Sequence, residues 1–201
     1  MDKRVETIKN WLKSGSINIF GLPMSGKDTV GKRLAELLGA EFLSSGDIIR
    51  DYEAKKDDHM TENGELIPTN KFYDIVLPHF YSEELIDKPL ILSSIGRWEG
   101  EEDEVMKNTK DAGHEIRAVI YLKLSEDDVR TRWTAAKELG DRGLRGDDAD
   151  PAVFETRIEE FNEKTRPVLK HYDQLNLLIE VDASGTRDEV FDNVLNALSV
   201  L

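Results

Sequence analysis

Apolar residues along the chain form two patterns that alternate with each other. Short, almost entirely apolar runs predict buried strands at residues 17–20, 90–95, 119–124 and 177–181, with a shorter candidate at 41–43. Elsewhere apolar side chains recur every three or four residues, which predicts amphipathic helices at residues 3–13, 26–38, 105–112, 154–172 and 188–198. Strands that alternate with helices predict an α/β fold, a mainly parallel sheet with helices on both faces.

Two polar segments interrupt this alternation. Residues 51–81 are rich in charge and contain an Asn-Gly pair and Pro68, and residues 137–152 are polar and contain three glycines. Neither has the apolar stripe of a core helix, so we expect both to be insertions that lie on the core. Pro167 falls inside the long pattern near the C-terminus. It is expected to kink or divide that helix, because proline lacks the N–H that a helix interior needs.

Composition and charge narrow the class of protein. The 201 residues, 39% of them hydrophobic, suit one folded domain over residues 1–201. No apolar stretch reaches the length of about 18 residues that a membrane helix needs, and we expect no secretory signal. The absence of cysteine excludes disulfides and thiolate metal sites and suits a cytoplasmic location. The 41 acidic and 27 basic residues give a net charge of −14, which argues against polynucleotide partners.

A phosphate-binding loop follows the first predicted strand and opens the next predicted helix. Its residues are Gly21, Leu22, Pro23, Met24, Ser25, Gly26, Lys27, Asp28 and Thr29. Glycines in this position free backbone N–H groups to surround phosphate oxygens, and Lys27 is placed to reach the β- and γ-phosphates of ATP. The strict pattern has Ser or Thr directly after the lysine, where this chain has Asp28. The guanine signature Asn-Lys-x-Asp is absent, which argues against a GTPase switch.

Five further motifs follow the loop in a definite order. They are Leu-Ser-Ser-Gly-Asp-Ile-Ile-Arg at 43–50, Asn-Gly-Glu-Leu-Ile-Pro at 63–68, a strand-to-helix passage at 124–132, Arg-Gly-Asp-Asp at 145–148 followed by Arg157, and Thr-Arg-Pro-Val-Leu at 165–169 followed by Tyr172. In this order and with this spacing, the chain resembles the adenylate kinase family of nucleoside monophosphate kinases, in its short-lid form. The resemblance implies a P-loop NTPase fold with a five-stranded parallel sheet. It also implies an acceptor-binding insertion at 51–81 and a short lid at 137–152.

The implied reaction moves the γ-phosphate of ATP, bound with Mg²⁺, to a nucleoside monophosphate, with AMP as the first choice. Arginine suits such a site because its planar, permanently charged fork binds phosphate oxygens in pairs. The resemblance gives a catalytic set of Lys27, Arg97, Arg145 and Arg157. It gives an ATP site of Gly21, Pro23, Met24, Ser25, Gly26, Lys27, Asp28 and Thr29, with Arg132 stacked on the adenine and Arg142 near the phosphates. It gives an acceptor site of Ser45, Arg50, Gly64, Leu66, Ile67 and Arg97. We expect that no side chain of the protein binds a metal ion directly and that the protein is a monomer.

Ser93 stands where the family has an Asp that helps organise the water shell of Mg²⁺. We expect a slower enzyme or an altered metal dependence, and Asp28 is a candidate to replace part of the missing charge. On this basis Ser93→Asp should raise activity. The alternative is a catalytically weakened nucleotide-binding or sensing protein.

Two further positions depart from the family. Glu101 stands where the family has a Gln that contacts the acceptor base, which leaves UMP, CMP or dTMP open as alternative acceptors. Trp98 either stacks on a base or packs as a half-buried residue. The second lid arginine is replaced by Ala136, so Lys137 or Arg142 is expected to stand in.

Overall fold

Five parallel strands form the centre of the protein. The computed structural model describes residues 2–57, 59–138 and 150–201. The strands are β1 (Ser16–Gly21), β2 (Glu41–Ser44), β3 (Leu90–Ser93), β4 (Ile116–Lys123) and β5 (Leu178–Asp182), in the sheet order β2-β3-β1-β4-β5. Every pairing is parallel. This confirms the predicted sheet, and the short candidate at 41–43 is a true strand.

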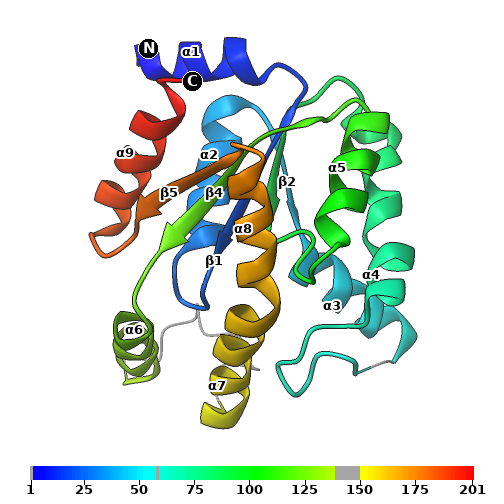
Figure 1. Ribbon diagram of the computed structural model, residues 1–201, viewed down its shortest axis with the longest axis vertical. Coiled ribbons are helices and arrows are strands. Elements are labelled where there is room, and N and C mark those ends of the chain that lie inside the picture. Colours follow the sequence, from blue (N-terminus) through cyan, green and yellow to red (C-terminus); the bar gives the residue numbers. More distant parts are fainter. Residues whose placement is uncertain (1, 58, 139–149) are drawn as a thin grey trace.

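Helices cover both faces of the sheet, as predicted (Figure 1). The α-helices are α1 (Lys3–Leu12), α2 (Lys27–Leu38), α3 (Ser45–Lys56), α4 (Thr69–Ile75), α5 (Glu101–Asp111), α6 (Glu126–Glu138), α7 (Pro151–Glu160), α8 (Arg166–Gln174) and α9 (Arg187–Leu198). Two 3-10 turns, η1 (Leu77–Tyr81) and η2 (Glu83–Leu85), follow α4. In the sheet order, the step from β1 to β2 runs opposite to the step from β3 to β4. Right-handed crossovers therefore place α2 and α5 on opposite faces.

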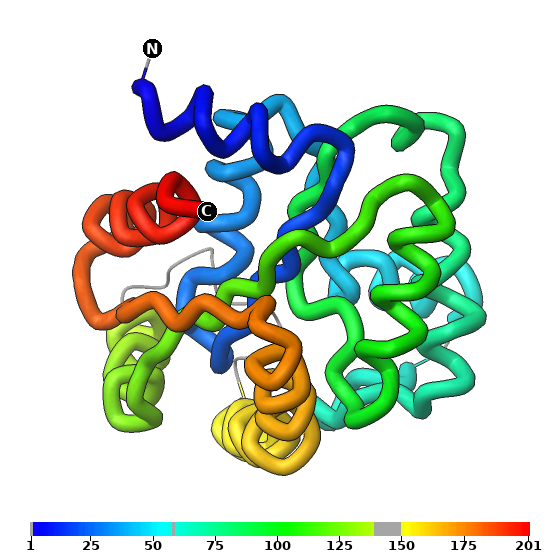
Figure 2. The backbone as a smooth tube through the Cα atoms, turned by 45° about the horizontal axis from the view of Figure 1, so that its top comes forward, coloured from blue at the N-terminus to red at the C-terminus, as the bar shows by residue number. Residues whose placement is uncertain are grey.

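The two ends of the chain meet on one side of the molecule. Helices α1 and α9 lie side by side (Figure 2). Arg4 on α1 donates hydrogen bonds to Asp192 at 2.7 Å and to Asn196 at 2.6 Å, both on α9. The first and last helices thus pack with α2 in the same layer of helices.

The long C-terminal helical pattern is divided, as Pro167 predicted. Helix α7 ends at Glu160, a π-helical turn, η4 (Phe161–Thr165), follows, and α8 begins at Arg166. Proline in the first turn of α8 needs no N–H, because those N–H groups have no partner within the helix. Phe161 and Tyr172, on either side of Pro167, are both buried, with their rings against Tyr121 of β4 and Phe20 of β1.

The loops that contain the predicted site residues lie at one edge of the sheet. Strands β1, β2 and β3 are parallel neighbours, so the phosphate loop, Ser45 and Ser94 follow strand ends at the same edge. Parallel sheets bind ligands at their carboxyl edge, where the crossover direction reverses. In this sheet the reversal lies between β1 and β3.

Candidate functional site

The phosphate loop has the tight conformation that its glycines predict. A Cβ at Gly21 would collide with the side chain of Ser25, so the chain folds back on itself directly after β1. Gly26 has φ +88°, a left-handed conformation that favours glycine, and it is the N-cap of α2. The loop therefore delivers the first N–H groups of α2, with the positive end of the helix dipole, to one place.

A cavity opens over this loop, and we refer to it as the donor pocket. It is lined by Met24, Ser25, Gly26, Lys27, Asp28, Thr29, Val30, Arg33, Arg132, Ala135, Ala136, Arg157, Gly185, Thr186, Arg187, Val190 and Phe191. Arg132 donates hydrogen bonds to the carbonyl oxygens of Ala183 at 2.6 Å and Gly185 at 3.2 Å. Its guanidinium thus fixes the loop after β5 as a wall of the pocket.

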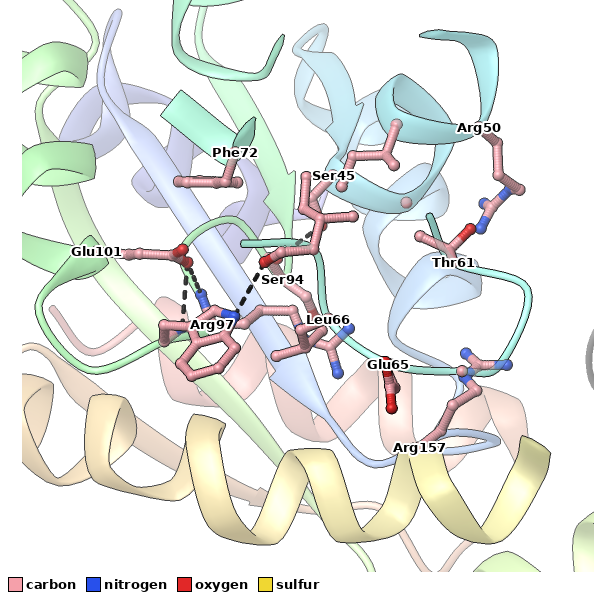
Figure 3. A pocket seen from close by; sticks show the side chains of 15 residues that line it. Ser45, Arg50, Thr61, Glu65, Leu66, Phe72, Ser94, Arg97, Glu101 and Arg157 are labelled. Carbon is pink, nitrogen blue, oxygen red and sulfur yellow. Dashed lines mark hydrogen bonds between the residues drawn. The ribbon is translucent and has the colours of Figure 1, made fainter. Parts of the chain in front are cut away.

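A second cavity, the acceptor pocket, lies between α3, α5 and the loop that precedes α4 (Figure 3). It brings together all six residues predicted for the acceptor, Ser45, Arg50, Gly64, Leu66, Ile67 and Arg97. Arg50 pairs with Asp47 at 2.6 Å. Ser45 donates to the carbonyl oxygen of Ser94 at 2.7 Å, which joins the ends of β2 and β3.

A buried carboxylate lies at the inner end of the acceptor pocket. Glu101 is only 2% exposed, and its Oε2 accepts hydrogen bonds from the backbone N–H groups of Arg97 at 2.8 Å and Trp98 at 3.1 Å. Burial raises the pKa of the Glu101 carboxyl, against these hydrogen bonds and the charge of Arg97, which lower it. The acidic run at residues 99–104 begins a helix, but Glu101 and Glu102 are buried within it.

Trp98 anchors the loop of residues 61–68, which precedes α4 and which we call the acceptor loop. Its Nε1 donates to the carbonyl oxygen of Ile67 at 3.1 Å, and the Lys164 ammonium lies 4.1 Å from the centre of its ring. Lys164 also pairs with Glu160, whose Oε2 accepts the N–H of Leu66 at 2.9 Å. Trp98 is therefore a half-buried residue that holds the loop, while its ring still lines the pocket.

A third cavity shares lining residues with both pockets, and we call it the connecting cavity. It is lined by Gly21, Pro23, Lys27, Asp28, Ser44, Ser45, Gly46, Ser93, Ser94, Arg97 and Arg157. Arg157, from α7, lines this connecting cavity and both pockets. Lys27, Arg97 and Arg157 thus bring three positively charged side chains to one cavity.

Oxygen atoms suited to a hard cation lie beside Lys27. Ser93 donates its hydroxyl hydrogen to Asp28 Oδ1 at 2.6 Å, and Thr29 lies next in the loop. Carboxylate and hydroxyl oxygens fit Mg²⁺, which commonly binds through one or two carboxylates and substrate phosphates. Within the described ranges, no group of three or more His, Cys, Asp or Glu residues is placed to hold a metal ion.

Some residues expected in the site lie outside the described residues, and one segment that lines the donor pocket was not predicted from the sequence. Arg142 and Arg145 are outside the described residues, as is most of the predicted lid. Lys137, a candidate second lid cation, lies with its ammonium 4.9 Å from the ring centre of Trp133. The start of α9, which lines the donor pocket, did not stand out in the sequence. Thr186 and Glu189 form a capping box that marks a helix start, but such a signal does not place the helix beside the phosphate loop.

Known proteins that are similar to this chain indicate its family. A family model described as an AAA domain matches residues 20–152. The chain is 33% identical over 194 residues to an adenylate kinase of Schistosoma mansoni, covering 92% of this chain and 93% of that one. It is 28% identical over 191 residues to an adenylate kinase of Thermus thermophilus, covering 92% and 97%. It is 27% identical over 194 residues to an adenylate kinase of Bacteroides fragilis, covering 92% and 99%. In the part of the chain that the structure describes, no helix is long and apolar enough to cross a membrane. The matched family model and the identity to the Schistosoma mansoni enzyme show that the chain belongs to the adenylate kinase family and is a kinase of the nucleoside monophosphate kinase type.

Proposed function

We propose that this kinase transfers the γ-phosphate of ATP to AMP and forms two molecules of ADP. One observation carries the proposal: the connecting cavity shares lining residues with both pockets, and Lys27, Arg97 and Arg157 all line it. Two nucleotides bound in these pockets would present their phosphates to each other. In the proposal, residues 51–81 belong to the acceptor lobe, and residues 137–152, with Arg142 and Arg145, form the lid.

The reaction needs no nucleophile from the protein. An oxygen of the AMP phosphate attacks the γ-phosphorus, a new P–O bond forms, and the bond from the γ-phosphorus to the β–γ bridging oxygen breaks. The main tasks of the protein are to align the two phosphates and to balance their negative charge. Lys27 and Arg157 serve the donor phosphates, and Arg97 serves the acceptor. Mg²⁺ bound with the nucleotide would neutralise phosphate charge, and Asp28 and Ser93, which are hydrogen-bonded to each other, are the residues that would hold it.

The acceptor base is the finer part of the proposal. Glu101, whether ionised or protonated, keeps an oxygen that accepts a hydrogen bond from an amino group. AMP and CMP carry an exocyclic amino group on the base, whereas UMP and dTMP carry a carbonyl oxygen at the corresponding place. A buried carboxyl at this depth of the pocket thus favours AMP, with CMP as the second candidate.

A coupled assay with AMP, CMP, GMP, UMP and dTMP tests this assignment. We expect the highest kcat/KM with AMP and little turnover with UMP or dTMP. If AMP is inert while another monophosphate turns over, the adenylate assignment is wrong although the kinase assignment stands. Calorimetry with two adenosines joined through five phosphates adds a test without turnover. Tight binding of one analogue per chain supports adjacent donor and acceptor sites, and absence of binding contradicts them.

A further inference from the structure

Strand β1 contains a buried asparagine between two isoleucines. Asn18 is 0% exposed, and in the sheet it is paired with Leu92 of β3 and Val119 of β4. A buried amide side chain costs free energy unless it is hydrogen-bonded, because it has left water. The partners of Asn18 therefore indicate what this side chain does in the protein.

The amide of Asn18 binds the backbone of a single residue just beyond β3. Its Nδ2 donates to the carbonyl oxygen of Ile95 at 2.7 Å, and its Oδ1 accepts the N–H of Ile95 at 3.3 Å. Ile95 is itself 0% exposed, so both of these backbone groups need a partner inside the protein. Asn18 thus provides the hydrogen bonds that a neighbouring strand would provide if β3, which ends at Ser93, continued to Ile95.

Residues 94–100, which we call the Arg97 segment, have an unusual backbone conformation. Ser94 has φ +51°, Gly96 has φ +79° and Gly100 has φ +94°. A left-handed serine is strained, and glycine permits many conformations and selects none. Such a backbone persists only where the surrounding structure holds it. The position of Arg97 therefore depends on contacts from other elements.

Buried side chains hold the Arg97 segment at successive backbone positions. They are Ser45 at residue 94, Asn18 at 95, Glu101 at 97 and 98, and Glu102 at 100. Figure 3 shows the bonds from Glu101. Glu101 fixes the backbone on the α5 side of Arg97, and Asn18 fixes it on the β3 side. Because the residue between Ile95 and Arg97 is glycine, the contact at Ile95 limits rotation that Gly96 would otherwise allow.

We infer that Asn18 is a positioning residue for Arg97, which fixes from β1 the backbone before the arginine so that its side chain lines the connecting cavity. Among the described residues, Arg97 lines the acceptor pocket and the connecting cavity but not the donor pocket. Loss of the Asn18 contact should therefore impair use of the acceptor and leave ATP binding intact. The inference rests on the proposed role of Arg97 at the acceptor phosphate.

The test is a double-mutant cycle of Asn18→Ala and Arg97→Ala. One readout is kcat/KM at saturating ATP for AMP, or for the best acceptor among the five monophosphates. The other is the dissociation constant of ATP, measured by calorimetry without an acceptor.

Ser16→Ala is the matched control for Asn18→Ala. Ser16 is a buried polar residue of the same strand, and its hydroxyl donates to the carbonyl oxygen of His114 at 2.8 Å, at the end of β1 away from the phosphate loop. Thermal unfolding verifies that each variant is folded. Asn18→Ser, which keeps a polar group beside Ile95, replaces Asn18→Ala in the cycle if the alanine variant does not fold.

Asn18→Ala should lower kcat/KM for the acceptor about ten-fold or more, because two buried backbone groups lose their partner and the segment must move to find others. The dissociation constant of ATP should stay within roughly two-fold of wild type, and Ser16→Ala should keep both quantities. In the Arg97→Ala background, Asn18→Ala should cost less than roughly two-fold more, because the side chain that it positions is already absent.

Different results separate this inference from the proposed function. If Arg97→Ala keeps the wild-type kcat/KM, the proposed role of Arg97 is wrong and the inference fails with it. If Arg97→Ala lowers kcat/KM but Asn18→Ala is no worse than Ser16→Ala, the inference is wrong and the proposed function stands. The inference is also wrong if Asn18→Ala costs the same factor in both backgrounds, or if it weakens ATP binding as much as it lowers kcat/KM.

Discussion

Gly64→Ala tests whether the acceptor loop must rest on α7 for the acceptor to bind. Gly64 has φ +80°, and a Cβ built there would lie 2.7 Å from the carbonyl oxygen of Val153 and 3.0 Å from Cγ of Arg157. The first of these neighbours is helix backbone, which has little freedom to move. The loop itself would have to leave the helix.

The structure indicates two free-energy costs of Gly64→Ala. A left-handed conformation costs an alanine about 1–2 kcal/mol more than a glycine. Movement of the loop away from α7 also breaks the hydrogen bond from the N–H of Leu66 to Glu160, 2.9 Å long, which is worth about 1.5–3 kcal/mol because its acceptor is charged. The loss of this hydrogen bond alone would disfavour the loop conformation that binds the acceptor enough to raise the acceptor KM about ten-fold or more.

The assay is steady-state kinetics at saturating ATP, with thermal unfolding in parallel. Gly113→Ala is the matched control, because Gly113 has φ +88° at the end of α5 and nothing lies within 4 Å of the added Cβ. Both variants should lose stability through backbone strain, but only Gly64→Ala should raise the acceptor KM. Equal acceptor KM values in the two variants would refute the reasoning, since strain alone would then account for Gly64.

Three other predictions address the phosphate loop, the acceptor loop and the partly buried pair of His171 and Glu102. Lys27→Met should lower kcat by about 100-fold or more, measured in the coupled assay, because it removes a charge from the phosphate cavity. Trp98→Phe loses the hydrogen bond to Ile67, worth about 0.5–1.5 kcal/mol, so the acceptor KM should rise several-fold while the ATP KM stays near that of wild type. His171 donates to the buried Glu102 at 2.8 Å, and this hydrogen bond raises the pKa of the imidazole above its usual 6.5. The stability that His171 contributes should therefore be full below about pH 6.5 and decline as the pH rises through the raised pKa. His171→Asn should cost more in urea unfolding at about pH 6 than at about pH 9.

Each of these changes has a control on α1 or an outcome that contradicts it. Lys9→Met removes an exposed lysine far from the site and should keep kcat. Trp11→Phe alters a partly buried tryptophan and should leave both KM values unchanged. An equal cost of His171→Asn at both pH values would mean that packing, and not the charge on the ring, accounts for the contribution of His171.

Much of the fold could be predicted because its signals are local. The run at 17–20 is buried on both faces of a parallel sheet, so its strand had to be almost entirely apolar. Gly39 ends α2 with φ +69°, and Pro167 lies in the first turn after the division of the C-terminal helix. The start predicted for the insertion, residue 51, falls inside helix α3, which begins at Ser45 within the motif at 43–50.

The site was predictable where one motif holds all its parts. The phosphate loop carries its own strand, glycines and lysine, so its geometry follows from a few neighbouring residues. The bond between Asp28 and Ser93 joins positions that are 65 residues apart in the chain. The sequence suggested that Asp28 replaces a charge but did not indicate the contact. Likewise, the composition of 99–104 suggests a solvated helix start, and only tertiary packing buries Glu101 and Glu102 there.

The net charge of −14 and an anionic substrate are compatible because they act over different distances. At physiological ionic strength the field of an exposed charge is screened within about 8 Å. Most acidic side chains of this chain are exposed, whereas Lys27, Arg97 and Arg157 line one cavity. A mononucleotide bound as proposed would meet those cations at contact distance, where screening is weak. A polynucleotide would extend beyond the cavity and meet the acidic surface along its length, so we expect the same charge distribution to admit the first ligand and to disfavour the second.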